Sequence, residues 1–198
     1  MVKRGIEKMT KKVYWKTWKK TAVFIDVSNI YYSQRTLSWE IDYLKLIKFF
    51  KEKTNLTKAY FYSGVVSTKK SQQKFFTKMG TFGYIVKTKE VKWIKNKEGK
   101  IIKGKGNLDI ELALDMVLSL KTYDTAILLS GDSDFEPVIK YLRSKKRKVI
   151  VISSRGHISR ELARGADKYI PFESLKQFLK RSKKIINKKI TPDERGDV

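Results

Sequence analysis

The sequence predicts an α/β protein with a doubly wound, mostly parallel central sheet and helices on both of its faces. Short apolar runs alternate with amphipathic segments along most of the chain, which is typical of strands joined by crossover helices. The length of 198 residues is enough for one domain with a full core. A hydrophobic fraction of 41% and an aromatic fraction of 12% indicate a folded chain rather than a disordered one.

The first half of the chain alternates between strand and helix patterns. Strands are expected at residues 21–25, 59–66 and 83–88, and helices at 43–53 and 70–79. In the first of these helices, Leu44, Ile47 and Phe50 share one face. Apolar residues on both sides of a glycine-containing turn at 96–99 then predict a small inserted β-hairpin.

The second half continues the alternation. Asn107 is expected to cap a helix that runs to about Ser119 and is apolar almost all round, so this helix should be buried. Further strands are expected at 125–129, 149–152 and 169–171, and helices at 136–144, 159–164 and 174–184. Pro137 suits the first turn of the helix that it begins.

Composition sets the domain limits and the cellular setting. We expect a basic N-terminal tail at 1–20, one domain at 21–180 and a charged C-terminal tail at 181–198. The N-terminus lacks the apolar run of a signal peptide, and no apolar stretch approaches the roughly 20 residues of a membrane span. The chain has no Cys, which excludes disulfides, thiolate nucleophiles and zinc–cysteine sites. We therefore expect a cytoplasmic protein.

The charge predicts an anionic partner. Lys and Arg number 45 against 20 Asp and Glu, a formal charge of +25. RNA, single-stranded or structured, is the expected partner; an anionic membrane and a basic, heat-adapted surface are the alternatives. Trp93 on the basic hairpin and Tyr84 before it would either stack on unpaired bases or pack the hairpin. We expect no membrane contact and leave a homodimer open.

Four carboxylates follow strand ends or begin a helix. Asp26 ends the first strand, Asp132 and Asp134 follow the fourth, and Asp109 lies in the first turn of the apolar helix. If the first and fourth strands are adjacent, Asp26 and Asp132 meet at the carboxyl edge of the sheet, where such folds bind ligands. Neighbouring carboxylates repel each other unless a cation lies between them, so this is a candidate metal site. The alternatives are helix capping by Asp26 or Asp134 and a helix-dipole role for Asp109.

If the chain hydrolyses phosphodiester bonds, the residues that it lacks exclude the mechanisms that do not use a metal. His157 is the only His, which rules out a ribonuclease with paired imidazoles. No Gly-x-Ser-x-Gly occurs, so a serine nucleophile elbow is absent. Asp26 is followed by Val27 and Ser28, so the Asp-x-Asp of a haloacid-dehalogenase-like phosphatase is missing near the N-terminus. Metal catalysis remains as the route to phosphodiester cleavage.

Three segments resemble the signatures of NYN domains, in the LabA-like group of PIN-like metal-dependent nucleases. They are Phe-Ile-Asp-Val-Ser-Asn at 24–29, Lys-Gly-Asn-Leu-Asp at 105–109 and Ser-Gly-Asp-Ser-Asp-Phe at 130–135. The resemblance implies ribonuclease chemistry with Mg²⁺ or Mn²⁺ bound by Asp26, Asp109, Asp132 and Asp134. The chain departs from the family at Asn107 and Leu108, where Gly-Val is common; this should alter helix entry rather than ligation.

Four further residues are candidates for substrate binding: Asn29, Lys105, Ser130 and Ser133. Each has a plainer alternative, which is turn formation for Asn29 and the serines and a solvated basic hairpin for Lys105. Asp115 is expected to be structural or to support the site. The leading function is a metal-dependent ribonuclease, and the alternative is a non-catalytic RNA-binding or regulatory NYN module.

Overall fold

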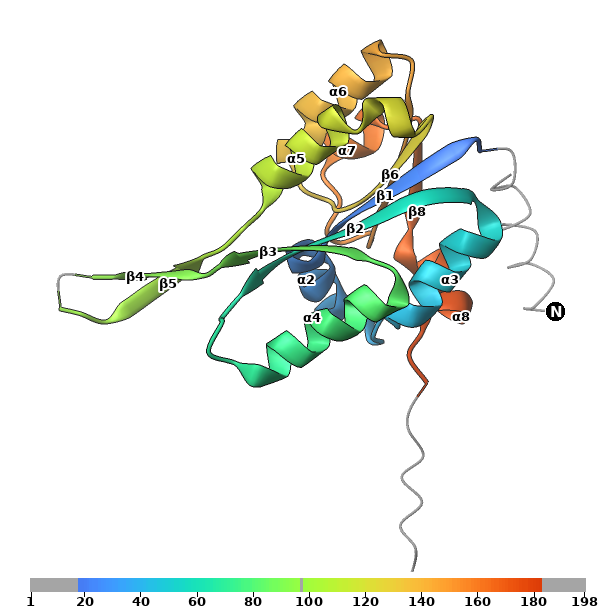
Figure 1. Ribbon diagram of the computed structural model, residues 1–198. Helices are drawn as coiled ribbons and strands as arrows, with labels where there is room; N and C mark the ends of the chain where they lie inside the picture. Colours follow the sequence, from blue (N-terminus) through green and yellow to red (C-terminus); the bar gives the residue numbers. More distant parts are fainter. Residues whose placement is uncertain (1–17, 97, 183–198) are drawn as a thin grey trace, which may run out of the picture.

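The computed structural model describes residues 18–96 and 98–182, except the side chains of 94, 95 and 101–105. A six-stranded sheet in the order β3-β2-β1-β6-β7-β8 forms its centre, and every pairing in it is parallel (Figure 1). The strands are β1 (Lys20–Asp26), β2 (Asn55–Val65), β3 (Ile85–Glu90), β6 (Thr125–Leu129), β7 (Lys148–Ser153) and β8 (Lys168–Pro171). The expected fold class is confirmed.

The sheet is wound in two directions from its centre. The chain moves from β1 outward through β2 to β3, and later returns to β6, which pairs with the other side of β1. Ile25 of β1 lies opposite Leu129 of β6 in this pairing. The loops that leave β1 and β6 therefore meet at the carboxyl edge of the sheet, as predicted.

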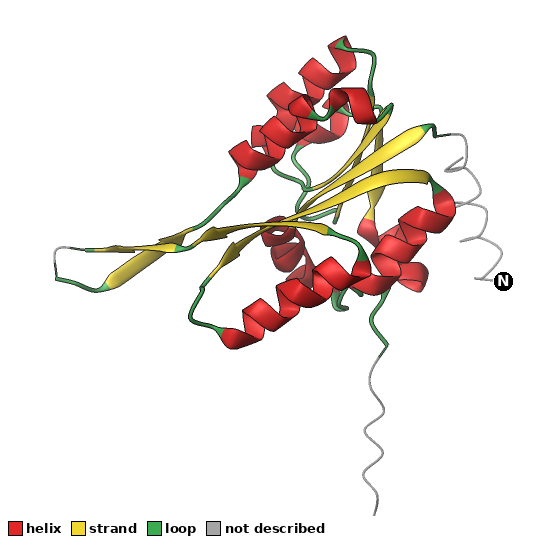
Figure 2. Cartoon of the chain, in the orientation of Figure 1, coloured by secondary structure: helices red, strands yellow, loops and turns green. Residues whose placement is uncertain are grey.

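Helices cover both faces of the sheet (Figure 2). One face carries α2 (Val27–Leu37), α3 (Tyr43–Lys53), α4 (Lys70–Phe82) and α8 (Lys176–Leu179); the other carries α5 (Asp109–Leu118), α6 (Glu136–Ser144) and α7 (Arg160–Gly165). Strand residues alternate between the two cores, so Val23 and Ile25 join the first and Ala22 and Phe24 the second. Burial on both faces explains why the central strands are apolar throughout.

The predicted hairpin is also present. Strands β4 (Lys92–Lys95) and β5 (Ile101–Lys105) pair antiparallel and extend away from the body of the domain (Figure 1). Its base packs closely against the end of β2, because a Cβ on Gly64 would lie only 2.8 Å from the carbonyl oxygen of Gly106. The hairpin therefore leaves and re-enters the domain at the carboxyl edge, directly before α5.

Helix α2 was not predicted, and this is the main error in the expected element order. The Asp26 side chain caps it by accepting a hydrogen bond from the Asn29 backbone N–H. Ile30, Ser33 and Leu37 are its buried residues, spaced to lie on one helical face. Polar residues fill most of the remaining positions, so the apolar spacing of a helix is weak in this segment.

The expectation that α5 is buried all round is wrong. Of its large side chains only Leu112 and Met116 are buried, whereas Ile110, Leu114 and Leu118 are 73%, 52% and 78% exposed. The helix lies on one face of the sheet, and no further described element covers its outer side. The N-cap position is Leu108 rather than Asn107.

Smaller differences concern the bounds of individual elements and of the domain. Strand β2 begins at Asn55, four residues before the predicted start. The last helix is divided into a 3-10 turn at Phe172–Leu175 and the short α8, and residues 183 and 184 of the prediction lie outside the described residues. Trp18 is buried in the first core, although it belongs to the predicted tail. Within the described residues, no helix has both the length and the apolar character needed to cross a bilayer.

Candidate functional site

Asp26 lies at the centre of the candidate site. It is the last residue of β1, and its side chain is only 8% exposed. One carboxylate oxygen accepts from the backbone N–H of Asn29 at 3.1 Å, and the other accepts from the Ser130 hydroxyl at 2.9 Å. Burial raises the pKa of Asp26 to about 6; the two hydrogen bonds oppose this shift, and the nearby charges of Asp109 and Asp132 add to it.

The loop after β6 is held against the start of α2. The Asn29 side-chain oxygen accepts from the backbone N–H of Gly131 at 3.1 Å. The Asp132 N–H donates to the Ser130 hydroxyl at 3.3 Å, and the Asp134 N–H donates to the Asp132 carboxylate at 3.0 Å. Ser130 therefore bridges the Asp26 carboxylate and the backbone of Asp132.

Gly131 has no room for a side chain. A Cβ there would overlap the carbonyl of His157 and approach the Ser153 hydroxyl to 2.7 Å. The loops after β6 and β7 thus pack backbone against backbone beside the carboxylates. This contact is one that the sequence analysis missed, and the glycine between Ser130 and Asp132 was its only signal.

Asp109 reaches the candidate site from the face of the sheet that carries α5, opposite the face that carries α2. It is the first residue of α5, and its carboxylate accepts from the Asn107 amide at 2.7 Å. Partial burial raises its pKa; the Asn107 hydrogen bond lowers it, and the charges of Asp132, Asp134 and Glu111 raise it further. The departure from the family pattern at Asn107 thus supplies a hydrogen bond to a predicted site residue.

The four predicted carboxylates therefore lie at the carboxyl edge of the sheet, where the segments 24–29, 105–109 and 130–135 meet. Asp26 is buried, Asp109 and Asp132 are half-buried, and Asp134 is exposed. None of the four forms an ion pair with a described Lys or Arg, and the five ion pairs of the described chain lie elsewhere. The described side chains nevertheless include no group of three or more acidic or His residues placed closely enough to hold a metal ion.

The sequence and fold can now be compared with known proteins. The family model of the NYN domain matches residues 20–176. The chain belongs to the NYN domain family. This NYN domain is 33% identical over 166 residues to the low amplitude and bright protein LabA of Synechococcus elongatus, a match that covers 82% of this chain and 89% of LabA.

A solved structure supports the same fold. A protein of unknown function from Vibrio parahaemolyticus superimposes with a TM-score of 0.68 at 24% identity, covering 82% of this NYN domain and 96% of that chain. The resemblance seen in the three signature segments is confirmed, and it places the chain among the nuclease-like modules of the PIN superfamily.

The remaining predicted residues of this NYN domain take different positions. Ser130 is fully buried and directed at Asp26, whereas Ser133 is exposed in the 3-10 turn Ser133–Phe135. Lys105 ends β5, and its side chain lies outside the described part of the structure. Of the two alternatives for Tyr84, packing is the one observed: the side chain is buried in the first core and donates to the Tyr43 carbonyl at 2.7 Å, so it cannot stack on bases.

The acidic residues further along α5 contact the sheet and its edge. Asp115 accepts a hydrogen bond from the Tyr62 hydroxyl at 2.9 Å and lies 3.9 Å from the Lys87 ammonium. Glu111 pairs with Lys89 at 2.6 Å. These contacts attach α5 to β2 and β3, and they agree with the structural role expected for Asp115.

Proposed function

We propose that this NYN domain is a metal-dependent ribonuclease that hydrolyses RNA phosphodiester bonds at the cluster of Asp26, Asp109, Asp132 and Asp134. The observation that carries the proposal is the buried Asp26 carboxylate, which has carboxylates as neighbours and no ion pair with a described Lys or Arg. In a protein with a formal charge of +25, basic partners are abundant. None of the described Lys or Arg side chains pairs with the carboxylate cluster, and this favours a cation from outside the chain as its partner.

The donor set fits Mg²⁺ or Mn²⁺, because all four side chains offer hard carboxylate oxygens. Mg²⁺ retains several waters and is commonly held by one or two carboxylates together with substrate phosphates, so three acidic side chains within reach of one ion are not required. Asp26 and Asp132 would be the ligands, with Asp109 and Asp134 contributing directly or through water. When bound, the ion supplies a more acidic water for attack on phosphorus and offsets charge on the phosphate oxygens.

The residues of the chain itself orient this site. The Ser130 hydroxyl and the Asn29 N–H fix both oxygens of Asp26, and the Asn29 side chain holds the loop that carries Asp132. In this proposal, Asn29 and Ser130 therefore orient the carboxylates. Ser133 and Lys105 are the proposed contacts to the RNA backbone. RNA is proposed as the partner because of the charge, and a cytoplasmic location stays a prediction.

Cleavage of labelled single-stranded RNA and of its DNA counterpart tests the proposal, with Mn²⁺, Mg²⁺ or EDTA added in parallel. Wild-type protein should cleave RNA only with the metal, and Asp132→Asn should abolish cleavage without loss of the fold. Glu52→Gln is the matched control, because it makes the same change on the exposed end of α3, at the opposite edge of the sheet. Cleavage retained by Asp132→Asn, or cleavage in EDTA, would contradict the assignment.

A non-catalytic RNA-binding module is the second candidate. It is favoured by the lack of any described group of three acidic side chains within reach of one ion. The same experiment separates the two functions, because this module would bind RNA in a salt-sensitive way and leave it intact with either metal.

A further inference from the structure

Helix α2 exposes two adjacent tyrosines beside the carboxylate cluster. Tyr31 and Tyr32 are 57% and 55% exposed, whereas aromatic side chains such as Phe24, Phe50 and Phe61 are fully buried. Two neighbouring aromatic rings in water gain nothing from core packing. Both rings are therefore accessible to a ligand.

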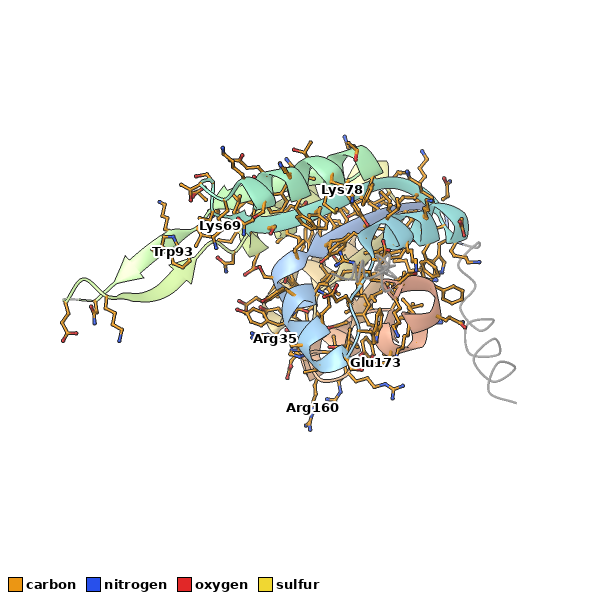
Figure 3. All side chains as sticks on the ribbon, turned by 90° about the horizontal axis from the view of Figure 1, so that it is seen from below. Arg35, Lys69, Lys78, Trp93, Arg160 and Glu173 are labelled. Carbon is orange, nitrogen blue, oxygen red and sulfur yellow. The ribbon has the colours of Figure 1, made fainter. Side chains whose placement is uncertain are left out.

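A guanidinium group lies against both rings. The two ring centroids are 5.7 Å apart with an interplanar angle of 74°. Arg35 follows four residues after Tyr31 and three after Tyr32, so it lies on the same side of the helix, 5.7 and 6.0 Å from the two centroids. Arg35 forms no ion pair with a described carboxylate. Its positive charge is therefore available to a ligand at the rings. Figure 3 views this face of the domain, with Arg35 labelled on α2.

The aromatic pair is rigidly connected to the candidate site. Asp26 caps α2, so the backbone of Tyr31 lies five residues, or roughly 7.5 Å along the helix axis, beyond the backbone of Asp26. Tyr31 and Arg35 also line a groove of about 420 Å³ that extends to Phe75 of α4 and to Arg181. A strand whose phosphate reached Asp26 could therefore lay its next bases along α2.

We infer that Tyr31, Tyr32 and Arg35 form a stacking platform for unpaired bases of an RNA strand that enters the carboxylate site. Aromatic faces and guanidinium planes stack on exposed bases, which a duplex does not offer. The positive charge at the platform suits a polyanion and disfavours a basic partner. The inference rests on the proposed function for the identity of its ligand, and it names the form of RNA that the site takes.

Binding of labelled single-stranded RNA, measured by fluorescence anisotropy in EDTA, tests the platform independently of cleavage. Tyr31→Ala/Tyr32→Ala should weaken binding by at least about 10-fold, since each stacked base contributes about 5- to 150-fold. Tyr31→Phe/Tyr32→Phe keeps the rings and should bind like the wild type. Tyr141→Ala is the matched control, because Tyr141 on α6 is 41% exposed and also has a cation, Lys145, at 5.3 Å from its ring.

The outcomes separate the platform from the nuclease. Weak binding by the double alanine variant with normal binding by the phenylalanine and Tyr141→Ala variants supports the platform, whether or not the wild type cleaves RNA. Equal binding by all variants overturns it, even if the wild type is a nuclease. A wild type that binds no single-stranded RNA, or that binds duplex RNA of the same sequence equally well, also overturns it.

Discussion

Asp26 is a carboxylate held in a place that disfavours its charge. It is buried among the strand ends, and two hydrogen bonds orient it without neutralising it. The pKa, raised to about 6, reflects how much this position disfavours the charged form of the carboxyl group. A residue that only capped α2 would not need burial beside two other carboxylates, so the arrangement favours a cation ligand over a simple cap.

The pKa of Asp26 predicts how stability changes with pH in the absence of divalent metal. Between about pH 4 and about pH 6 the folded state retains a proton that the unfolded state has released, so stability should fall as the pH rises through this window. A shift of about two pH units corresponds to about 3 kcal/mol. Urea unfolding in EDTA should therefore show Asp26→Asn gaining up to about 3 kcal/mol over the wild type near pH 7.5 and much less near pH 4.5. An equal difference at both pH values would contradict the raised pKa.

Gly131 predicts a strong local packing effect. Gly131→Ala places a methyl group against the His157 carbonyl and the Ser153 hydroxyl, so the loop carrying Asp132 must move. We expect a loss of unfolding free energy of about 1–3 kcal/mol or more in thermal or urea denaturation. Gly156→Ala is the control, since a Cβ there meets nothing within 4 Å. Equal stability of the two variants would contradict the close packing.

At the scale of elements, α2 and α5 show opposite ways in which composition misleads. Helix α2 has few apolar residues, yet Ile30 and Leu37 on one face and the Asp26 cap are enough to hold it on the sheet. Helix α5 is apolar on most positions, yet only the Leu112 and Met116 side makes core contacts. A helix on an open sheet face buries one stripe, and its composition cannot say which.

The two sides of α5 should respond differently to substitution. Leu112→Ala removes a fully buried side chain and should cost about 2–5 kcal/mol of unfolding free energy. Leu118→Ala removes the same atoms from a side chain that is 78% exposed and should change stability by less than about 0.5 kcal/mol. Urea denaturation of both variants tests this. A large loss for Leu118→Ala would mean that its side chain is covered in solution.

At the scale of the whole molecule, charge and sheet topology act together. The chain carries a formal charge of +25, while the carboxylate cluster occupies the carboxyl edge of the sheet. A strongly positive chain attracts a polyanion, and a cluster of carboxylates within it offers a place for a cation. This division of charge is what the proposed reaction requires.

The overall charge predicts a strong salt dependence of RNA binding. For single strands the slope of log affinity against log salt is about −0.7 per phosphate contacted, so contact with roughly five phosphates gives about −3.5. Anisotropy titrations between about 50 and about 200 mM salt measure this slope. An uncharged-backbone analogue of the same base sequence should show a slope near zero. A shallow slope for RNA itself would contradict electrostatic binding.

Most of the fold followed from local patterns. The central strands and the hairpin were recognisable because short apolar runs end at turn residues, and Asp26 and Asp132 follow such runs within three residues. The expectation that the strands before them are neighbours was confirmed because doubly wound sheets obey strong rules of connection. Helix α2 was missed because its stability comes from the cap and the sheet rather than from its own composition.

The sequence by itself was enough to predict the parallel sheet and to locate the carboxylates near the strand ends. It also contains the family signatures. Only the tertiary structure decided that Ser130 and Asn29 orient Asp26, that Gly131 must lack a side chain, and that Tyr31 and Tyr32 stand in solvent. The reason is physical. Hydrophobic periodicity is encoded within a few neighbouring residues, whereas the partner of a buried polar group lies up to about a hundred residues away, and packing alone brings it there.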